Sequence, residues 1–148
     1  MSPPDLQAFF DDYRSTFARY DAGALAELFA FPFHVVSDTE EVTPLSVAGR
    51  QDWIGVLEGL LGAYRTLGVA KGEPLELDVV ELTSRVASAR VHWELRREDA
   101  SPIYDFTAVY TVAQISGAWR VAAIAHDELP KLQAALARQA GEAGGRSP

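Results

Sequence analysis

The sequence contains no cysteine, which excludes disulfide bonds, thiolate catalysis and every cysteine-based metal site. Basic residues are few: 13 lysines and arginines stand against 21 aspartates and glutamates, and the net charge is −8. A field of this sign repels nucleic-acid phosphates and anionic membrane surfaces. The first residues, MSPPDLQAFFDDY, are acidic where a signal peptide is basic, and no long apolar run follows. We therefore expect a cytoplasmic protein with no nucleic acid and no membrane as partner.

Sequence motifs for common cofactors and metals are also missing. The three histidines, His34, His92 and His126, do not have a metal-ligand spacing, and no HExxH or EF-hand pattern is present. The chain has no glycine-rich phosphate loop, no GxSxG elbow and no dinucleotide fingerprint, which argues against kinase, hydrolase and nicotinamide-dependent classes. We expect no metal and no cofactor.

The composition that is present is typical of one globular domain. Of the 148 residues, 48% are apolar and 23% are charged, enough to bury a single core. We assign residues 1–140 to this domain. Residues 141–148, GEAGGRSP, have too little apolar content to pack, so we expect them to form a disordered tail.

Apolar side chains that recur every three to four residues predict amphipathic helices. The first runs from about Asp5 to Tyr20 and carries an aromatic stripe, and a short second helix can be capped by Asp21. A long helix from about Gly49 to Leu67 ends at Gly68, which we expect to adopt the left-handed conformation of a C-cap. A final helix follows Asp127, which can cap its start.

Runs of β-branched and aromatic residues predict six strands: Phe33 to Ser37, Val42 to Val47, Leu75 to Thr83, Val86 to Arg97, Ile103 to Ala113, and Trp119 to Ala125. The last four are separated by connections short enough for antiparallel hairpins. Two helices, a short strand pair, a long helix and a four-stranded meander predict an α+β fold. In such a fold, helices pack against one face of a curved antiparallel sheet.

Three segments carry a family resemblance: YDAGALAELFA before a short strand, GRQDW at the start of the long helix, and GAWRV entering the last strand. Through them, and through the order of its elements, residues 5–128 resemble the nuclear transport factor 2-like (NTF2-like) superfamily and, within it, SnoaL-like proteins of the polyketide cyclase and ketosteroid isomerase type. The resemblance implies a cone-shaped α+β barrel, with an apolar pocket between the N-terminal helices and the curved sheet. Such proteins commonly pair as homodimers through the outer sheet face.

Two positions at which ketosteroid isomerases of this superfamily carry functional residues differ here. Their general-base aspartate falls nearest to Ser37, with Asp38 next to it, and their oxyanion-donating tyrosine falls near Thr16. These departures argue against steroid isomerisation.

The turn Ser116-Gly117 sets the register of the last hairpin if it is a two-residue turn. That register places Asp105 and His126 on one inward face, and a loop that keeps parity brings Trp93 beside Asp105. A carboxylate next to an imidazole orients the ring and raises its basicity, as proton transfer from a carbon or oxygen acid requires. The alternative is a polar pair at the barrel rim that has no catalytic role.

The same register predicts a pocket and a partner surface. The short first strand leaves either face open for His34, which we include among the pocket residues: Trp93, Trp53, Tyr64, Phe17, Tyr13, Val91, Val109, Ile124 and His34. The outward residues are large and apolar, which favours a homodimer, sheet against sheet: Tyr104, Phe106, Tyr110, Trp119 and Val121.

Two functions remain open at this point. The first is a cofactor-independent cyclase, isomerase or dehydratase that acts on a small, largely apolar carbonyl compound, with Asp105 and His126 as acid and base. The second is a non-catalytic dimeric module that binds an apolar ligand or a protein partner.

Overall fold

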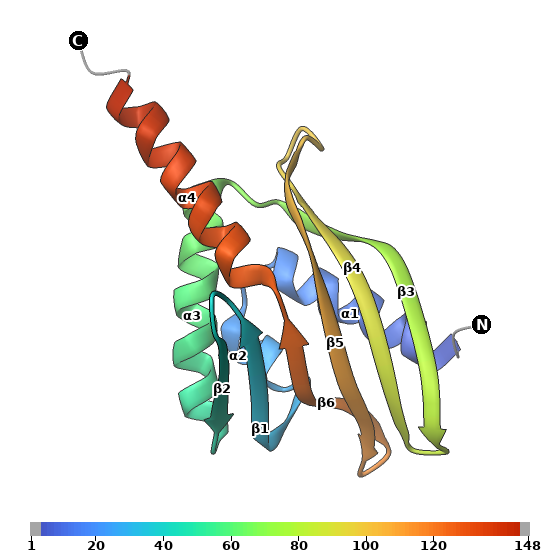
Figure 1. The fold of residues 1–148 in the computed structure, drawn as a ribbon. Helices are drawn as coiled ribbons and strands as arrows, with labels where there is room; N and C mark the ends of the chain where they lie inside the picture. The colour runs from blue at the N-terminus through green and yellow to red at the C-terminus, as the bar shows by residue number, and fades with distance from the viewer. Residues whose placement is uncertain (1–3, 146–148) are drawn as a thin grey trace.

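Two helices open the chain (Figure 1). The computed structural model describes residues 4–145, so residues 1–3 of the predicted domain lie outside the described residues. α1 (Pro4–Ala18) turns its aromatic stripe into the core. α2 (Ala22–Ala26) begins where the side chain of Asp21 accepts a hydrogen bond from the Ala24 N–H at 3.0 Å, which is the cap that the sequence predicts.

Six strands form one sheet in the order β2-β1-β6-β5-β4-β3. Their bounds are β1 (Phe29–Asp38), β2 (Val42–Val47), β3 (Lys71–Thr83), β4 (Val86–Arg96), β5 (Pro102–Ile115) and β6 (Ala118–His126). All neighbours pair antiparallel except β1 and β6, which are parallel. The expected antiparallel sheet is therefore mixed at this one pair, which joins distant parts of the chain such as Ser37 and His126, 89 positions apart.

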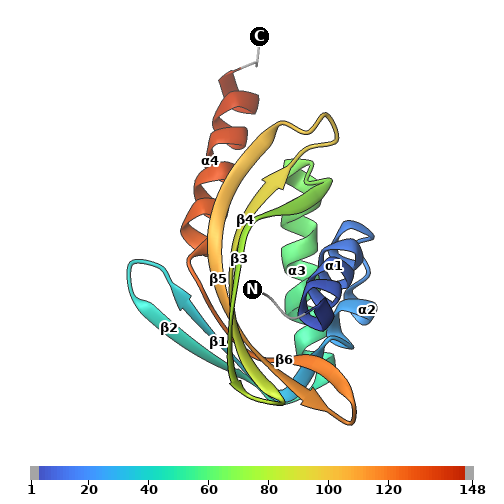
Figure 2. The ribbon, with the colours of Figure 1, turned by 90° about the vertical axis from the view of Figure 1, so that its right-hand side faces the viewer.

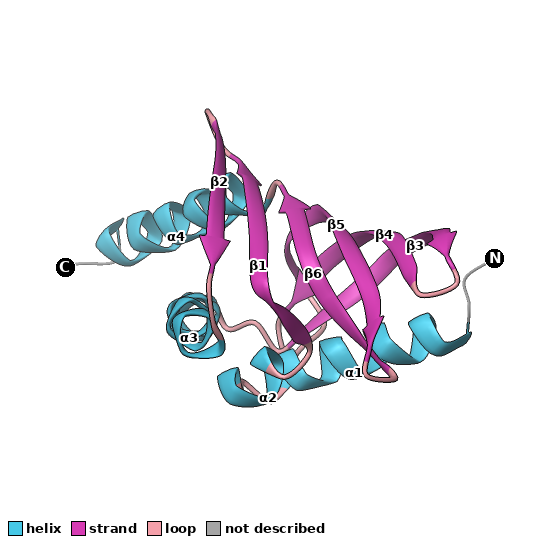
Figure 3. Ribbon diagram, turned by 90° about the horizontal axis from the view of Figure 1, so that it is seen from below, coloured by secondary structure: helices cyan, strands magenta, loops and turns pink. Residues whose placement is uncertain are grey.

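The sheet curves around the helices and leaves β2 and β3 as its two edges, so the barrel is not closed. α1, α2 and α3 (Arg50–Leu67) lie on the concave face (Figures 2 and 3). α3 ends at Gly68, whose φ of 75° is the left-handed cap that the sequence predicts. Side chains from both layers form one core, in which Leu25, Phe33 and Val91 are fully buried. The α+β class and the apolar interior agree with the sequence-based expectation.

A single extra residue in β6 changes the predicted register of the last hairpin. The turn is where the sequence places it: Ile115 pairs with Ala118, and Ser116 and Gly117 have φ values of 53° and 82°. The pairing then shifts at Ala122, a β-bulge, so that His126 faces Ala108 rather than Thr107. Because side chains alternate between the two faces of a sheet, a shift of one residue sends every side chain beyond it to the face opposite the predicted one.

The faces of β5 are the reverse of those predicted, because Trp93 of β4 pairs with Phe106. Phe106, Tyr110 and Val121 are buried in the core, where the sequence analysis placed them on an outer dimer face. Asp105 and Val109 point instead to the convex side of the sheet, and Asp105 pairs with Glu94 rather than with Trp93. The apolar set that motivated a sheet-to-sheet homodimer therefore faces inward, and the homodimer stays a prediction.

α4 (Glu128–Gly145) follows β6 directly, and its first turn lies against the end of the sheet (Figure 1). The helix extends past the predicted domain boundary at residue 140 to Gly145; residues 146–148 lie outside the described residues, and the disordered tail stays a prediction. Ala140 and Glu142 are good helix formers, and extending an existing helix is easier than starting one. None of the helices described between residues 4 and 145 is long and apolar enough to cross a membrane.

Candidate functional site

A cavity of about 400 Å³ lies between the concave sheet face, α1, α3 and the first turns of α4. Six residues that the sequence analysis assigned to a pocket line it: Tyr13, Phe17, Trp53, Tyr64, Trp93 and Ile124. Most of the wall is apolar, and the indole N–H of Trp93 is satisfied by the Tyr110 hydroxyl at 2.8 Å. A concave and largely apolar wall of this kind suits a small organic ligand.

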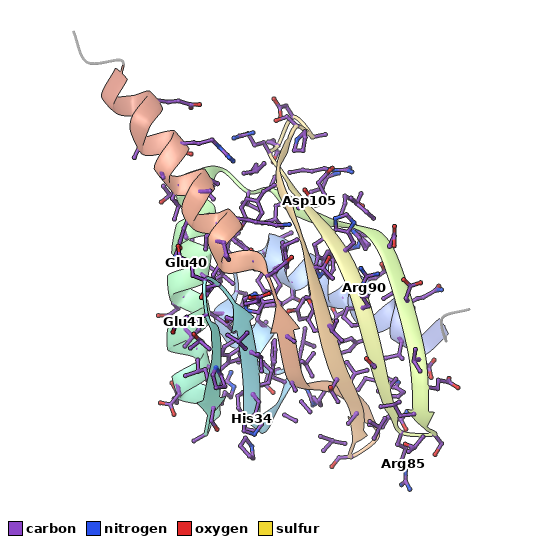
Figure 4. All side chains as sticks on the ribbon, in the orientation of Figure 1. His34, Glu40, Glu41, Arg85, Arg90 and Asp105 are labelled. Carbon is purple, nitrogen blue, oxygen red and sulfur yellow. The ribbon has the colours of Figure 1, made fainter. Side chains whose placement is uncertain are left out.

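The other assigned pocket residues lie elsewhere. Val91 is fully buried in the core behind the wall. Val109 is on the convex side of the sheet, because it alternates along β5 with the buried residues Ala108 and Tyr110. His34 is exposed and lies between the inward residues Phe33 and Val35, so its side chain points outward from β1 (Figure 4).

The structure separates Asp105 from His126. The Asp105 side chain is 54% exposed, and its Oδ2 lies 2.6 Å from Nε2 of His92 on the neighbouring strand. This contact lowers the pKa of Asp105, mainly through the hydrogen bond with His92. Figure 4 shows Asp105 on β5 and Arg90 on β4, on the side of the sheet away from α1. The expected pair of Asp105 and His126 is therefore not formed. The one-residue bulge in β6 is the cause, because it turns His126 to the face of the sheet opposite Asp105.

Glu128 is the buried acid of the cavity, and sequence analysis did not identify it. It is 6% exposed, it stands at the start of α4, and its Oε2 accepts hydrogen bonds from the hydroxyls of Tyr64 and Tyr104, the latter at 2.8 Å. Among the described residues no side chain or backbone donor reaches its other oxygen, Oε1. One carboxyl oxygen is thus held in place, while the residue lines the cavity.

Burial controls the ionisation of this cluster. It raises the pKa of Glu128 to about 7, although the two tyrosine hydrogen bonds act in the opposite direction. Burial also raises the pKa of Tyr64 well above its usual value, and the nearby Glu128 adds to the effect. Near neutral pH the tyrosines therefore remain donors, while Glu128 exchanges between its acid and its carboxylate, the condition that suits a general acid or base.

His126 lines the same cavity and has two hydrogen bonds of its own. Its Nδ1 accepts the backbone N–H of Glu128 at 3.1 Å, and its Nε2 lies 3.1 Å from the Ser37 hydroxyl. Burial lowers the pKa of His126, so the ring is neutral at pH 7. Because Nδ1 must accept, the single ring proton of the neutral form is on Nε2.

A sequence signal for Glu128 did exist. Glu128 shares one helix face with Leu132 and Ala135, at spacings of four and seven, and both of these are buried. An acidic residue in the first turn of a helix is common, because it interacts favourably with the helix dipole, and this ordinary explanation concealed the inward position. Residues 4–145 contain no group of three or more histidine, aspartate or glutamate side chains that could hold a metal ion.

Solved structures that resemble the chain share its fold. Aln2 from a Streptomyces species is 13% identical, with a TM-score of 0.67 over 86% of this chain and 93% of that one. An NTF2-like protein of unknown function from Shewanella oneidensis is 12% identical, with a TM-score of 0.65 over 83% and 96%. A protein from Novosphingobium aromaticivorans named as a candidate scytalone dehydratase is 18% identical, with a TM-score of 0.61 over 82% and 80%. At these identities the likeness establishes the fold alone.

The family assignment comes from the sequence itself. A comparison with curated proteins found no significant match. A family model described as NTF2-like protein (DUF6841) matches residues 4–129, which is most of the chain and includes Glu128. The segments that carried the resemblance lie within this range, so the expected superfamily is confirmed. The chain belongs to the NTF2-like protein family DUF6841.

Proposed function

We propose that this NTF2-like protein binds a small, largely apolar compound in its cavity and moves a proton on it without a cofactor, with Glu128 as the acid or base. The observation that carries the proposal is a buried carboxyl group on the wall of an otherwise mostly apolar cavity, held by two tyrosine hydroxyls. One of the solved structures with a similar fold is named as a candidate dehydratase, an enzyme class whose reaction also requires proton transfer.

The proposed chemistry is a proton transfer at carbon. The Glu128 carboxylate takes a proton from the carbon next to a carbonyl group, and the C–H electron pair becomes that of an enolate. The same group, now protonated, returns a proton to carbon. The ionisation of Glu128 near pH 7 lets it act in both directions at neutral pH. The hydroxyls of Tyr64 and Tyr104 orient the carboxyl group and stabilise its charge while it is ionised.

A second candidate is a non-catalytic dimeric binding module. It is favoured by the internal hydrogen bonds of the cluster, since Glu128 and His126 each have protein partners without any ligand. We include in it the homodimer through the outer sheet face. Val80 lies on that face and is 60% exposed, and a partner would cover it. Light scattering of the purified protein measures the oligomeric state directly.

Isotope exchange separates the two candidates. We expect the wild type to accelerate deuterium incorporation at the carbons next to the carbonyl of 2-tetralone in D₂O, followed by proton NMR. Glu128→Gln should lower this acceleration by about 100-fold or more, the usual contribution of a general base. Asp105→Asn is the matched control and should leave the rate unchanged, because Asp105 lies outside the cavity.

Three outcomes decide between the proposals. Binding of 2-tetralone without any acceleration by the wild type favours the binding module. Equal rates for the wild type and Glu128→Gln would remove Glu128 from the proposed role. A loss of activity in Asp105→Asn alone would return the assignment to the pair that the sequence suggested.

A further inference from the structure

The parallel pairing of β1 with β6 places Ser37 beside His126. Ser37 is near the end of β1, its side chain lines the cavity, and its Oγ is 3.1 Å from Nε2 of His126. The arrangement superficially resembles a serine nucleophile next to a histidine base. The hydrogen bonds of the ring show that the imidazole donates a hydrogen bond to the serine hydroxyl and does not accept one from it.

The backbone decides which atom donates. The N–H of Glu128 can only donate, so Nδ1 of His126 must present its lone pair, and the proton of the neutral ring is on Nε2. The Nε2–H then donates to Ser37 Oγ. His126 cannot take the serine proton in this tautomer, which argues against a nucleophilic serine. The serine hydroxyl keeps its own hydrogen, for which no acceptor is present among residues 4–145.

We propose that the Ser37 hydroxyl is the hydrogen-bond donor for a carbonyl oxygen of the ligand, and that His126 is a positioning residue that aims it. This inference rests on the proposed ligand binding in the cavity and adds the polar group by which the ligand is recognised. A donor that already receives a hydrogen bond from a neighbouring N–H is polarised, which strengthens the bond that it donates.

The arrangement also fits the proposed proton transfer. When the Glu128 carboxylate removes a proton from carbon, negative charge develops on the carbonyl oxygen, and a fixed donor there stabilises it. Glu128 and Ser37 both line the cavity, and His126, which holds Ser37, is two residues from Glu128, so the base and the donor face the same bound molecule. His126 is the last residue of β6 and Glu128 is the first of α4, which keeps the two side chains close together.

A pair of probes that differ in one oxygen tests the inference. The probes are 2-tetralone and tetralin, similar in shape, and their affinities are measured by ligand-observed NMR titration. We expect Ser37→Ala to weaken the binding of 2-tetralone about tenfold and to leave that of tetralin unchanged, because one hydrogen bond is lost. Ser46→Ala is the matched control, since Ser46 is an exposed residue of the adjacent strand β2. Thermal melts compare the folding of both variants with that of the wild type.

The role of His126 has its own readouts. We expect its ¹⁵N shifts to report a proton on Nε2 and a bare Nδ1. His126→Phe should weaken 2-tetralone binding about as much as Ser37→Ala does. His126→Gln, whose amide can donate to Ser37, should keep most of the wild-type affinity. A proton found on Nδ1 would overturn the assigned direction.

The failure of this inference can be told apart from that of the proposed function. If Ser37→Ala weakens the binding of both probes equally, or of neither, the assignment of Ser37 is wrong. Deuterium exchange by the wild type and by Glu128→Gln still tests the proposed proton transfer. If neither probe binds the wild type, ligand binding in the cavity and the role of Ser37 are refuted together. Selective loss for 2-tetralone without any exchange activity supports Ser37 and refutes catalysis.

Discussion

Replacing the buried carboxyl group by an amide should change how the stability of the protein depends on pH. In Glu128→Gln the side chain keeps its size and its acceptor oxygen for Tyr64 or Tyr104, but it no longer ionises. The pKa of Glu128 is about 7 in the folded chain, against an ordinary value of 4.5. The folded state therefore binds more protons than the unfolded state between these values, and the stabilisation is full below pH 4.5 and is lost as the pH rises through 7.

The interval from 4.5 to about 7 corresponds to about 3 kcal/mol of unfolding free energy, at about 1.4 kcal/mol per pH unit. Between pH 5 and pH 8, the wild type should lose about 2.5 kcal/mol of stability relative to Glu128→Gln. His126 acts in the opposite sense, because its pKa is lowered: its contribution is present above its unfolded value of 6.5 and declines as the pH falls below that value. Both proteins contain His126, so its contribution largely cancels in the difference.

Urea denaturation, followed by tryptophan fluorescence at pH 5 and pH 8, measures the difference. Glu58→Gln removes a carboxylate at an exposed position of α3 and serves as the control for the loss of one charge. If the stability of the wild type relative to Glu128→Gln stayed the same between pH 5 and pH 8, or rose with pH, the inference that Glu128 is buried and neutral at low pH would be refuted.

Two further substitutions test the outer face and a helix. Asp105→Asn should lower stability by less than about 1 kcal/mol in urea denaturation, because the contact with His92 is largely solvent-exposed; a loss several times larger would mean that the side chain is buried. Gly62→Ala should raise stability by about 0.5–1 kcal/mol in the same assay, because Gly62 is in the middle of α3 and an added Cβ meets nothing within 4 Å. A decrease in the second case would indicate a close neighbour at that position.

Much of the candidate site could be inferred from local patterns, and the rest depended on register. The aromatic stripe of α1 and the period of α3 identified Tyr13, Phe17 and Trp53 as inward residues, since a helical period fixes which side chains share a face. His126 was also assigned inward, and it lines the cavity. Its predicted partner was wrong, because the face that Asp105 occupies depends on residues counted across a strand pair.

The sequence alone determined the order and type of the helices and strands, though not the starts of β1 and β3, together with the Ser116-Gly117 turn and the family, because each follows from residues that are close together in the chain. Only the tertiary structure decided which polar groups meet in the cavity. The bulge at Ala122 turned His126 to the face of the sheet opposite Asp105, and the parallel pairing of β1 with β6 brought Ser37 to His126. Both effects arise from packing between distant segments, where a shift of one residue exchanges the two faces of a strand and local propensity favours neither.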